Sequence, residues 1–304
     1  MLLHEFPNIH WLKKQIQTRF EDQQRWDGVK LAHPGWPTVI INTRASNVRR
    51  ENIAGPMSIF TNVRGSSRII VNGKHAKVSD STFFVSNPQQ EYTLVLSDEA
   101  ETFNIHLGEK IGKESWYASM HTDAFLLANP FGSGETRELP NRLHWRDPSF
   151  DALISRLQNP ENPLDEEELV GAFTEMLLRD ESRTRQRSLS LSAVRAATRE
   201  EVARRLHLAS DYIYSNFEKD LSLDVLAQLS CLSKFHFLRL FKQYFRESPH
   251  QFVTRLRLEK SVQFLKSAHG VKEVAEKVGI NDSSSFSRLF RKHFGVYPTQ
   301  FATA

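Results

Sequence analysis

Two stretches of the chain decide its fold: LDVLAQLSCLSKFHFLRLFKQYFRESPHQF, which begins at Leu223, and VKEVAEKVGINDSSSFSRLFRKHFGVYPTQF, which begins at Val271. They are two copies of one pattern. Leu226 and Ala227 of the first copy correspond to Val274 and Ala275 of the second. After one extra turn residue in the second copy, the matches continue as Phe237, Arg239, Leu240, Phe241, Phe245, Pro249 and Phe252 with Phe286, Arg288, Leu289, Phe290, Phe294, Pro298 and Phe301. Such a repeat indicates one supersecondary unit used twice.

Each copy predicts a short helix, a break of a few residues and a longer helix, which is the layout of a helix-turn-helix. In the longer helices the apolar positions recur at the spacing of one helix face. They are Phe237, Leu240, Phe241, Tyr244 and Phe245 in the first copy, and Phe286, Leu289, Phe290, His293 and Phe294 in the second. We expect this stripe to pack inward, with Ala227 and Ala275 where the two helices of a copy approach closely.

The opposite faces of the longer helices carry no acidic residue. They hold Lys234, Phe235, Leu238, Arg239 and Lys242, and then Ser283, Ser284, Ser287, Arg288 and Arg291. Arginine can bond guanine bidentately, serine can bond base edges or phosphates, and an exposed phenylalanine or leucine can meet thymine methyl groups in the major groove. Phe235 and Leu238 could instead be core residues of a wider stripe, and Arg239 and Arg288 could hold phosphates or a buried carboxylate.

One long helix is predicted between the copies, because Pro249 suits the first turn of a helix and Gly270 suits its end. Roughly 19 helical residues span about 28 Å. Successive major-groove faces lie about 34 Å apart. One subunit could therefore reach two adjacent grooves.

Basic residues are concentrated in the same region. From Arg199 to the end there are 17 Lys and Arg against 11 Asp and Glu, which leaves 23 against 25 of the totals of 40 and 36 for the rest of the chain. A basic surface attracts nucleic acid, although charge alone is also compatible with a solvated helical surface. The composition, with 39% hydrophobic and 25% charged residues, is that of a globular protein, and 304 residues suffice for two domains.

The first part of the chain has a different sequence pattern. Between Trp36 and Leu107, short runs rich in β-branched and aromatic residues are separated by turn signals, of which Asn72-Gly73 is the strongest. Beyond Pro160 a helix is predicted whose apolar face, Leu169, Phe173, Met176 and Leu177, could pack on the β domain or form a dimer contact. We predict a first domain over residues 1–182 with helices at about 147–180, a linker over 183–199, and a helical domain over 200–304.

From about Arg204 to Phe301 the sequence resembles the AraC/XylS family of bacterial transcription regulators. The resemblance rests on LAQLSCLSKFHFLRLFK, on VAEKVGINDSSSFSRLFRKHFGVYPTQF, and on the two P-x-x-F endings at Pro249 and Pro298. It implies base contacts from Lys234, Phe235, Leu238 and Arg239, and from Ser283, Ser284, Ser287 and Arg288. Two positions depart from the family pattern: Arg246 replaces a usual glycine, and Ile280 replaces a common phenylalanine.

The resemblance also implies an α+β chain of two domains: an N-terminal cupin-like β-barrel or jelly roll with flanking helices, and a C-terminal all-α domain with two helix-turn-helix units joined by a long helix. It predicts a sequence-specific regulator of transcription, not an enzyme, that binds double-stranded DNA in the cytoplasm as a homodimer. RNA polymerase and a small-molecule effector are further possible partners. The effector pocket would be lined by Ile40, Phe60, Arg64, Phe84, Phe103 and His106, although ordinary core packing explains the same residues.

Two alternatives remain. A cupin-type enzyme would need several imidazoles and a carboxylate around one ion, but the chain has no H-x-H pair, and His75, His106 and His121 are isolated. We therefore predict no metal and no other cofactor. A protein-docking adaptor is the other alternative. The single cysteine, Cys231, excludes an internal disulfide and reads as small core filler. No apolar run approaches the roughly 18 residues of a membrane span.

Overall fold

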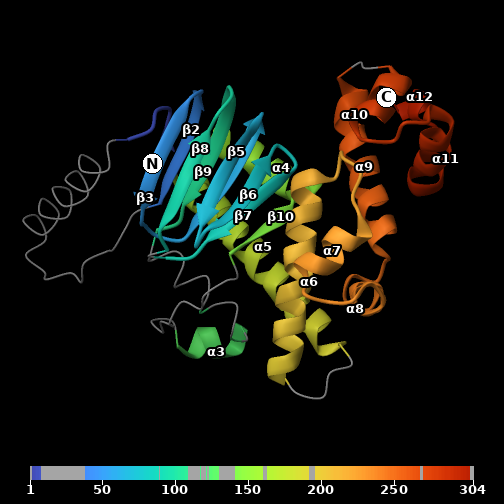
Figure 1. Cartoon of the computed structure of the whole chain (residues 1–304). Helices are drawn as coiled ribbons and strands as arrows, with labels where there is room; N and C mark the ends of the chain where they lie inside the picture. The colour runs from blue at the N-terminus through green and yellow to red at the C-terminus, as the bar shows by residue number, and fades with distance from the viewer. Residues whose placement is uncertain are drawn as a thin grey trace, which may run out of the picture. The chain divides into compact units, whose positions relative to one another are not determined.

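A computed structural model describes residues 2–7, 38–88, 90–108, 117, 121, 123–129, 141–159, 163–191, 196–267 and 270–301 (Figure 1). The chain forms two compact units, Met1–Arg183 and Thr184–Ala304. The first is rich in β-strands and the second is helical, as the sequence predicted.

The described part of the first unit forms two sheets, with strands in the order β1-β2-β9-β4-β7-β10 and β3-β8-β5-β6. The first sheet consists of β1 (Leu2–Leu3), β2 (Val39–Ala45), β9 (Ala100–His106), β4 (Ser58–Arg64), β7 (Thr82–Ser86) and β10 (Arg142–Trp145). The second consists of β3 (Val48–Ile53), β8 (Tyr92–Leu96), β5 (Ser66–Val71) and β6 (Lys74–Ser79). β1 pairs with β2 in parallel, and the other described pairs are antiparallel. Asn72 and Gly73, both with positive φ, form the predicted turn between β5 and β6.

Alternation along the strands gives the first sheet two different faces. Ile40, Ile59 and Phe103 point to one face and form a core with helices α4 (Pro148–Gln158) and α5 (Pro163–Leu189), which cover this face in Figure 1. Phe173 of α5 is fully buried in the same core. The apolar face of α5 therefore packs on the sheet, the first of the two roles predicted for it. A short helix, α3 (Asp123–Ala128), completes the described helices of this unit.

In its described residues the second unit comprises the end of α5 and seven further helices. These are α6 (Ala196–Asn216), α7 (Leu223–Leu229), α8 (Lys234–Phe245), α9 (Pro249–Lys266), α10 (Val271–Lys277), α11 (Ser283–Phe294) and α12 (Pro298–Phe301). None of the helices within the described residues is both long and apolar enough to cross a membrane.

Two features differ from the expected boundaries. The segment 183–199 contains the end of α5 and the start of α6, because it lacks the glycine and proline that would interrupt a helix. Within the second unit its Thr184 and Ser190 carbonyls accept hydrogen bonds from Tyr244 and Gln243 of α8. Gly270 does not end the connecting helix: α9 stops at Lys266, and Gly270 is the N-cap of α10.

Candidate nucleic-acid interface

The first helix pair, α7 and α8, is held by local hydrogen bonds at both starts. Ser222 accepts from the Asp224 amide and Ser233 from the His236 amide, which satisfies N–H groups that the helices leave open. Between the helices, Cys231 has a φ of 50° and is exposed. The expectation that Cys231 fills the core is wrong, because the turn needs a residue in the left-handed region at this position.

The second pair, α10 and α11, repeats this design with different residues. Gly279, with a φ of 79°, takes the place of Cys231 in the turn. Asp282 caps α11 by accepting from the amides of Ser284 and Ser285 at 3.2 and 2.8 Å. A hydrogen bond from the Ser285 side chain, together with these two amide bonds, lowers the pKa of Asp282, so the cap is charged at neutral pH.

The inward stripes of α8 and α11 form the cores of the two pairs. Phe237, Phe241 and Tyr244 are fully buried in α8, as are Phe286 and Phe290 in α11. The remaining stripe residues are partly buried, except His293, which is exposed. His293 was expected on the inner face, but its ring packs edge-on against Phe294 at the helix surface. The polar imidazole stays hydrated at this position.

The outward face of α8 is open to solvent. Lys234, Arg239 and Lys242 are exposed. Phe235 is 74% and Leu238 39% exposed, which rules out the alternative that they belong to the core. Arg239 forms no hydrogen bond or ion pair within the described part of the chain, whereas Lys234 Nζ lies 2.6 Å from Asp224 Oδ1 of α7. The face therefore combines two exposed apolar side chains with three cationic ones.

The outward face of α11 is shorter and more polar. Ser284, Arg288 and Arg291 are exposed, and Ser283 and Ser287 are partly buried. Ser287 donates its hydroxyl hydrogen to the Ser283 carbonyl. Ser287 can therefore only accept from a ligand while that bond persists.

Tyr297, which the sequence did not single out, lies beside this outer face. Arg291 lies over the ring of Tyr297, 4.6 Å from its centroid, and bonds its hydroxyl. The contact orients the Arg291 guanidinium towards Tyr297, which follows the end of α11. The proximity of Arg291 and Tyr297 could have been anticipated only from the turn after α11, which brings Tyr297 back towards the helix.

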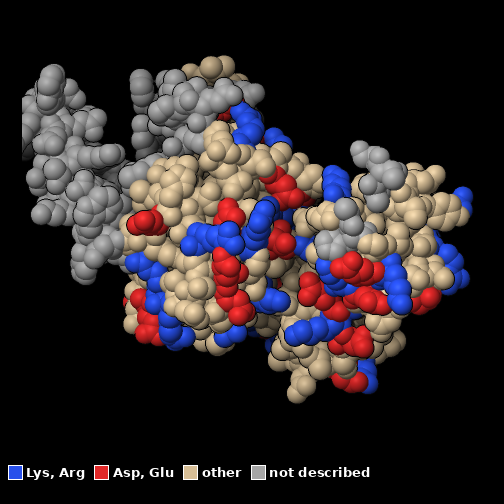
Figure 2. Space-filling model, turned by 90° about the horizontal axis from the view of Figure 1, so that it is seen from above, with Lys and Arg blue, Asp and Glu red and all other residues tan. Residues whose placement is uncertain are grey.

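Basic residues without acidic neighbours in the same helix are found on α8 and α11. On the face of the molecule drawn in Figure 2, basic and acidic side chains are interleaved. By contrast, α8 holds Lys234, Arg239 and Lys242 and α11 holds Arg288, Arg291 and Lys292, and neither helix contains an acidic residue. The two helices are therefore the cationic elements of the repeat.

Arg257 of α9 connects the two helix pairs. Its guanidinium donates to the carbonyl oxygens of Phe217 and Lys219, which precede α7, and to that of Gly279 in the turn before α11. A Cβ at Gly279 would lie 2.1 Å from the Glu218 carbonyl oxygen. The turn of the second pair thus packs directly on the chain that leads into the first. Arg257 was missed in the sequence because an arginine in a helix usually indicates a solvated surface.

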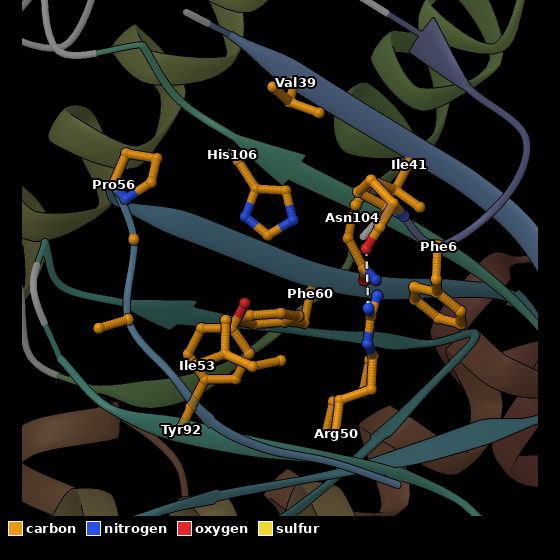
Figure 3. Close-up of a pocket in the computed structure, with 14 residues that line it drawn as sticks. Phe6, Val39, Ile41, Arg50, Ile53, Pro56, Phe60, Tyr92, Asn104 and His106 are labelled. Carbon is orange, nitrogen blue, oxygen red and sulfur yellow. Dashed lines mark hydrogen bonds between the residues drawn. The ribbon is translucent and has the colours of Figure 1, made fainter. Parts of the chain in front are cut away.

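The first unit contains a cavity of about 70 Å³ between its two sheets (Figure 3). Its walls come from β2, β4 and β9 on one side and from β3 and β8 on the other. Of the six residues predicted to line an effector pocket, Phe60 and His106 do so. Phe84 is buried beside Phe60 in the sheet without lining the cavity, and Arg64 is exposed at the end of β4.

Ile40 and Phe103 lie on the helix-covered face of the sheet instead. The side chains that face the cavity are their strand neighbours Val39, Ile41 and Asn104, because a shift of one residue moves a side chain to the other face. Among the described residues, no three His, Cys, Asp or Glu side chains are grouped so as to hold a metal ion.

Known proteins resemble the C-terminal part of the chain. A family model described as a helix-turn-helix domain matches residues 226–304. The probable transcriptional regulator LumQ of Photobacterium leiognathi is 33% identical over 95 residues, which is 31% of this chain and 38% of that protein. The MmsAB operon regulatory protein of Pseudomonas aeruginosa is 36% identical over 91 residues, 30% of each chain. The chain spans only about a third of the length of these relatives.

Solved structures with some similarity to the chain include the following two. A transcriptional regulator of Chromobacterium violaceum with an AraC-type DNA-binding domain is 28% identical, covers 33% of this chain and 90% of its own, and has a TM-score of 0.31. ToxT of Vibrio cholerae is 13% identical, covers 88% of this chain and 98% of its own, and has a TM-score of 0.34. The family match and the sequence relatives show that the C-terminal part of the chain contains a helix-turn-helix domain similar to those of transcription regulators, in agreement with the resemblance seen in the sequence.

Proposed function

We propose that the chain is a sequence-specific DNA-binding regulator of transcription whose helices α8 and α11 enter two neighbouring major grooves of one duplex. One observation carries this proposal. Each of these two repeated helices has an exposed outer face and three basic residues without an acidic one. They flank α9, whose 18 residues span about 27 Å, close to the distance of about 34 Å between successive groove faces.

The exposed residues divide into two roles by their chemistry. Arg239 and Arg288 sit at equivalent repeat positions in the middle of the outer faces, where bidentate bonds to guanine are possible. Phe235 and Leu238 would meet thymine methyl groups. Lys242 and Arg291, nearer the helix ends, would neutralise phosphates and set the register without reading sequence.

Selection of bound fragments from a random duplex pool tests the function. A defined motif should emerge, and affinity for it should fall steeply as salt rises, because cations on the protein replace counterions on the DNA. Arg288→Ala should relax the base preference at one position of the motif. Arg179→Ala removes an exposed helical arginine from the first unit, and this control should leave the motif unchanged. Equal affinity for all sequences would contradict the proposal.

The N-terminal unit would then be a cupin-like sensor or dimerisation domain. The cavity between its two sheets supports a sensor. Light scattering of the full chain tests dimerisation. Turnover assays on a cupin-type substrate panel, together with metal analysis, test the enzyme alternative, and activity there would contradict a purely regulatory role.

A further inference from the structure

The cavity between the sheets is apolar along most of its wall. Val39, Ile41, Phe60, Leu94 and Ile53 contribute hydrocarbon surface. Its volume of about 70 Å³ is several times the roughly 10–15 Å³ that one ordered water needs. Such a wall suits the hydrocarbon part of a small molecule.

Among the described residues that line this apolar space, one carries a formal charge. Arg50 of β3 is partly buried and lines the cavity. Its Nη2 donates to the Pro7 carbonyl at 2.7 Å, and its guanidinium lies 5.2 Å from the centre of the Phe6 ring. No ion pair joins Arg50 to a carboxylate of the described residues, whereas neighbouring Arg49 pairs with Glu51. A guanidinium whose contacts are only a neutral carbonyl and an aromatic ring is poorly compensated for the hydration that it loses on burial.

Three neutral polar side chains of the described lining residues, those of Tyr92, Asn104 and His106, accompany the arginine. Tyr92 is buried, its ring packs on Phe60, and burial raises the pKa of its phenol, so it keeps its proton. Arg50 is close enough to act electrostatically on this phenol. In Figure 3 the Tyr92 hydroxyl points towards the His106 ring, and Asn104 lies on the Arg50 side. The cavity therefore offers one cation and neutral hydrogen-bonding groups.

Residues of the N-terminal segment cover this site. Leu3 and Phe6 pack against Val39 and Ile41, and β1 extends the sheet beside β2. The Pro7 carbonyl on Arg50 belongs to the same segment. It occupies one bonding direction of the guanidinium that a stronger, charged acceptor could take.

We propose that this cavity binds a small monocarboxylate with an apolar body, whose carboxylate replaces the Pro7 carbonyl on Arg50. The hydrocarbon part would lie against Phe60, Ile53 and Leu94. A polyol would leave its hydroxyls without partners along this wall. A phosphate ester would bring a second negative charge for which Arg50 is the only cation among the lining residues.

The inference rests on the proposed function only in treating the first unit as a sensor. Binding is therefore measured by calorimetry on the full chain without DNA. The probes are straight-chain monocarboxylates of four to ten carbons, benzoate and phenylacetate, each paired with its neutral primary amide. DNA binding is measured separately on the same preparations, so a failed pocket and a failed DNA-binding function give different results.

At least one carboxylate should bind at least about tenfold more tightly than its amide, because its bond to Arg50 is charge-assisted. Arg50→Gln should abolish this preference and Arg50→Lys should retain part of it. Arg49→Gln, one residue away and exposed, is the matched control and should bind like the parent chain. A circular dichroism spectrum and a thermal unfolding transition like those of the parent chain show that Arg50→Gln folds.

Three results would overturn the proposal: no carboxylate of the panel binds at millimolar concentration, amides bind as well as carboxylates, or Arg50→Gln keeps the preference. Should Arg50→Gln fail to fold, Phe60→Leu is used instead. It retains the charge, and it should change which chain length binds best while preserving the preference for carboxylates over amides.

Discussion

Arg257 donates a hydrogen bond from its Nη1 to the carbonyl oxygen of Gly279 over 2.8 Å. Because the same guanidinium also bonds Phe217 and Lys219, one side chain of α9 joins the approach to the first helix pair with the turn of the second. We expect this clamp to fix the separation and direction of α8 and α11, on which simultaneous binding to two grooves would depend.

Replacing Arg257 with Met should therefore impair spacing selectivity. A duplex whose two half-motifs are moved apart by one base pair should bind the parent chain far more weakly than the selected duplex, and the variant should show a smaller difference. We also expect a loss of about 2 kcal/mol in the free energy of unfolding, since carbonyl groups lose a charged donor. Arg255→Met, on the same helix and paired with Glu247 and Glu259, is the control. Unchanged spacing selectivity in Arg257→Met would show that other contacts set the geometry.

The turn at Gly279 should tolerate no side chain. Its φ of 79° and the 2.1 Å approach of a Cβ to Glu218 predict that Gly279→Ala costs at least about 2 kcal/mol, from left-handed strain and a backbone clash. Cys231→Gly, at the equivalent turn with a φ of 50°, should stabilise the chain by about 1 kcal/mol. Urea unfolding measures both. Equal effects of the same sign at the two turns would contradict this account.

The end of α8 carries an avoidable strain. Arg246 has a φ of 66° at the C-cap, where α11 has Gly295 at 80°. Arg246→Gly should raise the unfolding free energy by roughly 1 kcal/mol, and Gly295→Ala should lower it by a similar amount. Thermal denaturation of the two variants gives the comparison. An unchanged unfolding free energy in Arg246→Gly would mean that the arginine makes a compensating contact in solution.

Phe235 and Phe237 separate binding from folding. Phe235 is 74% exposed and Phe237 is fully buried. Phe235→Ala should leave stability within about 0.5 kcal/mol while weakening binding to the selected duplex, whereas Phe237→Ala should cost about 3–5 kcal/mol. Denaturation and gel retardation are measured on both. Parent-like DNA affinity in Phe235→Ala would remove this residue from the interface.

His106 should make stability depend on pH. Burial lowers the pKa of His106 to about 4, from 6.5 in the unfolded chain. The unfolded state binds the proton at a higher pH than the folded state does, so protonation favours unfolding. The contribution of neutral His106 to the free energy of unfolding is therefore complete above about pH 6.5, and up to about 3 kcal/mol is lost as the pH falls towards 4. His106→Gln should flatten the curve in that window. His144, whose pKa is also lowered, remains in both proteins and cancels in the difference. An unchanged curve in His106→Gln would show that His106 is protonated normally.

The repeat made the helical part of this fold predictable. Helical spacing identified Phe237, Phe241, Phe286 and Phe290 as inward-facing, and all four are buried. Hydrophobic periodicity is informative there because each helix has one face against the core and one against water. It failed at His293, since an aromatic ring with a polar edge satisfies the pattern but prefers the surface.

The cavity could be predicted only in part. β2 carries Val39, Ile40 and Ile41 in succession, so alternation cannot tell which face each side chain takes when both faces are covered. Arg50 was not predicted because a charged residue in a strand normally indicates the solvent face. Its role depends on the second sheet and on Pro7, far away in the sequence, both of which are tertiary features.

Methylation interference at guanine N7 on the selected duplex tests the central claim most directly. Two clusters of interference should appear about one helical turn, roughly 10 base pairs, apart on one face of the DNA. Arg239→Ala should remove one cluster and Arg288→Ala the other. A single cluster, or two clusters that disappear together in either variant, would contradict the claim that α8 and α11 read neighbouring grooves independently.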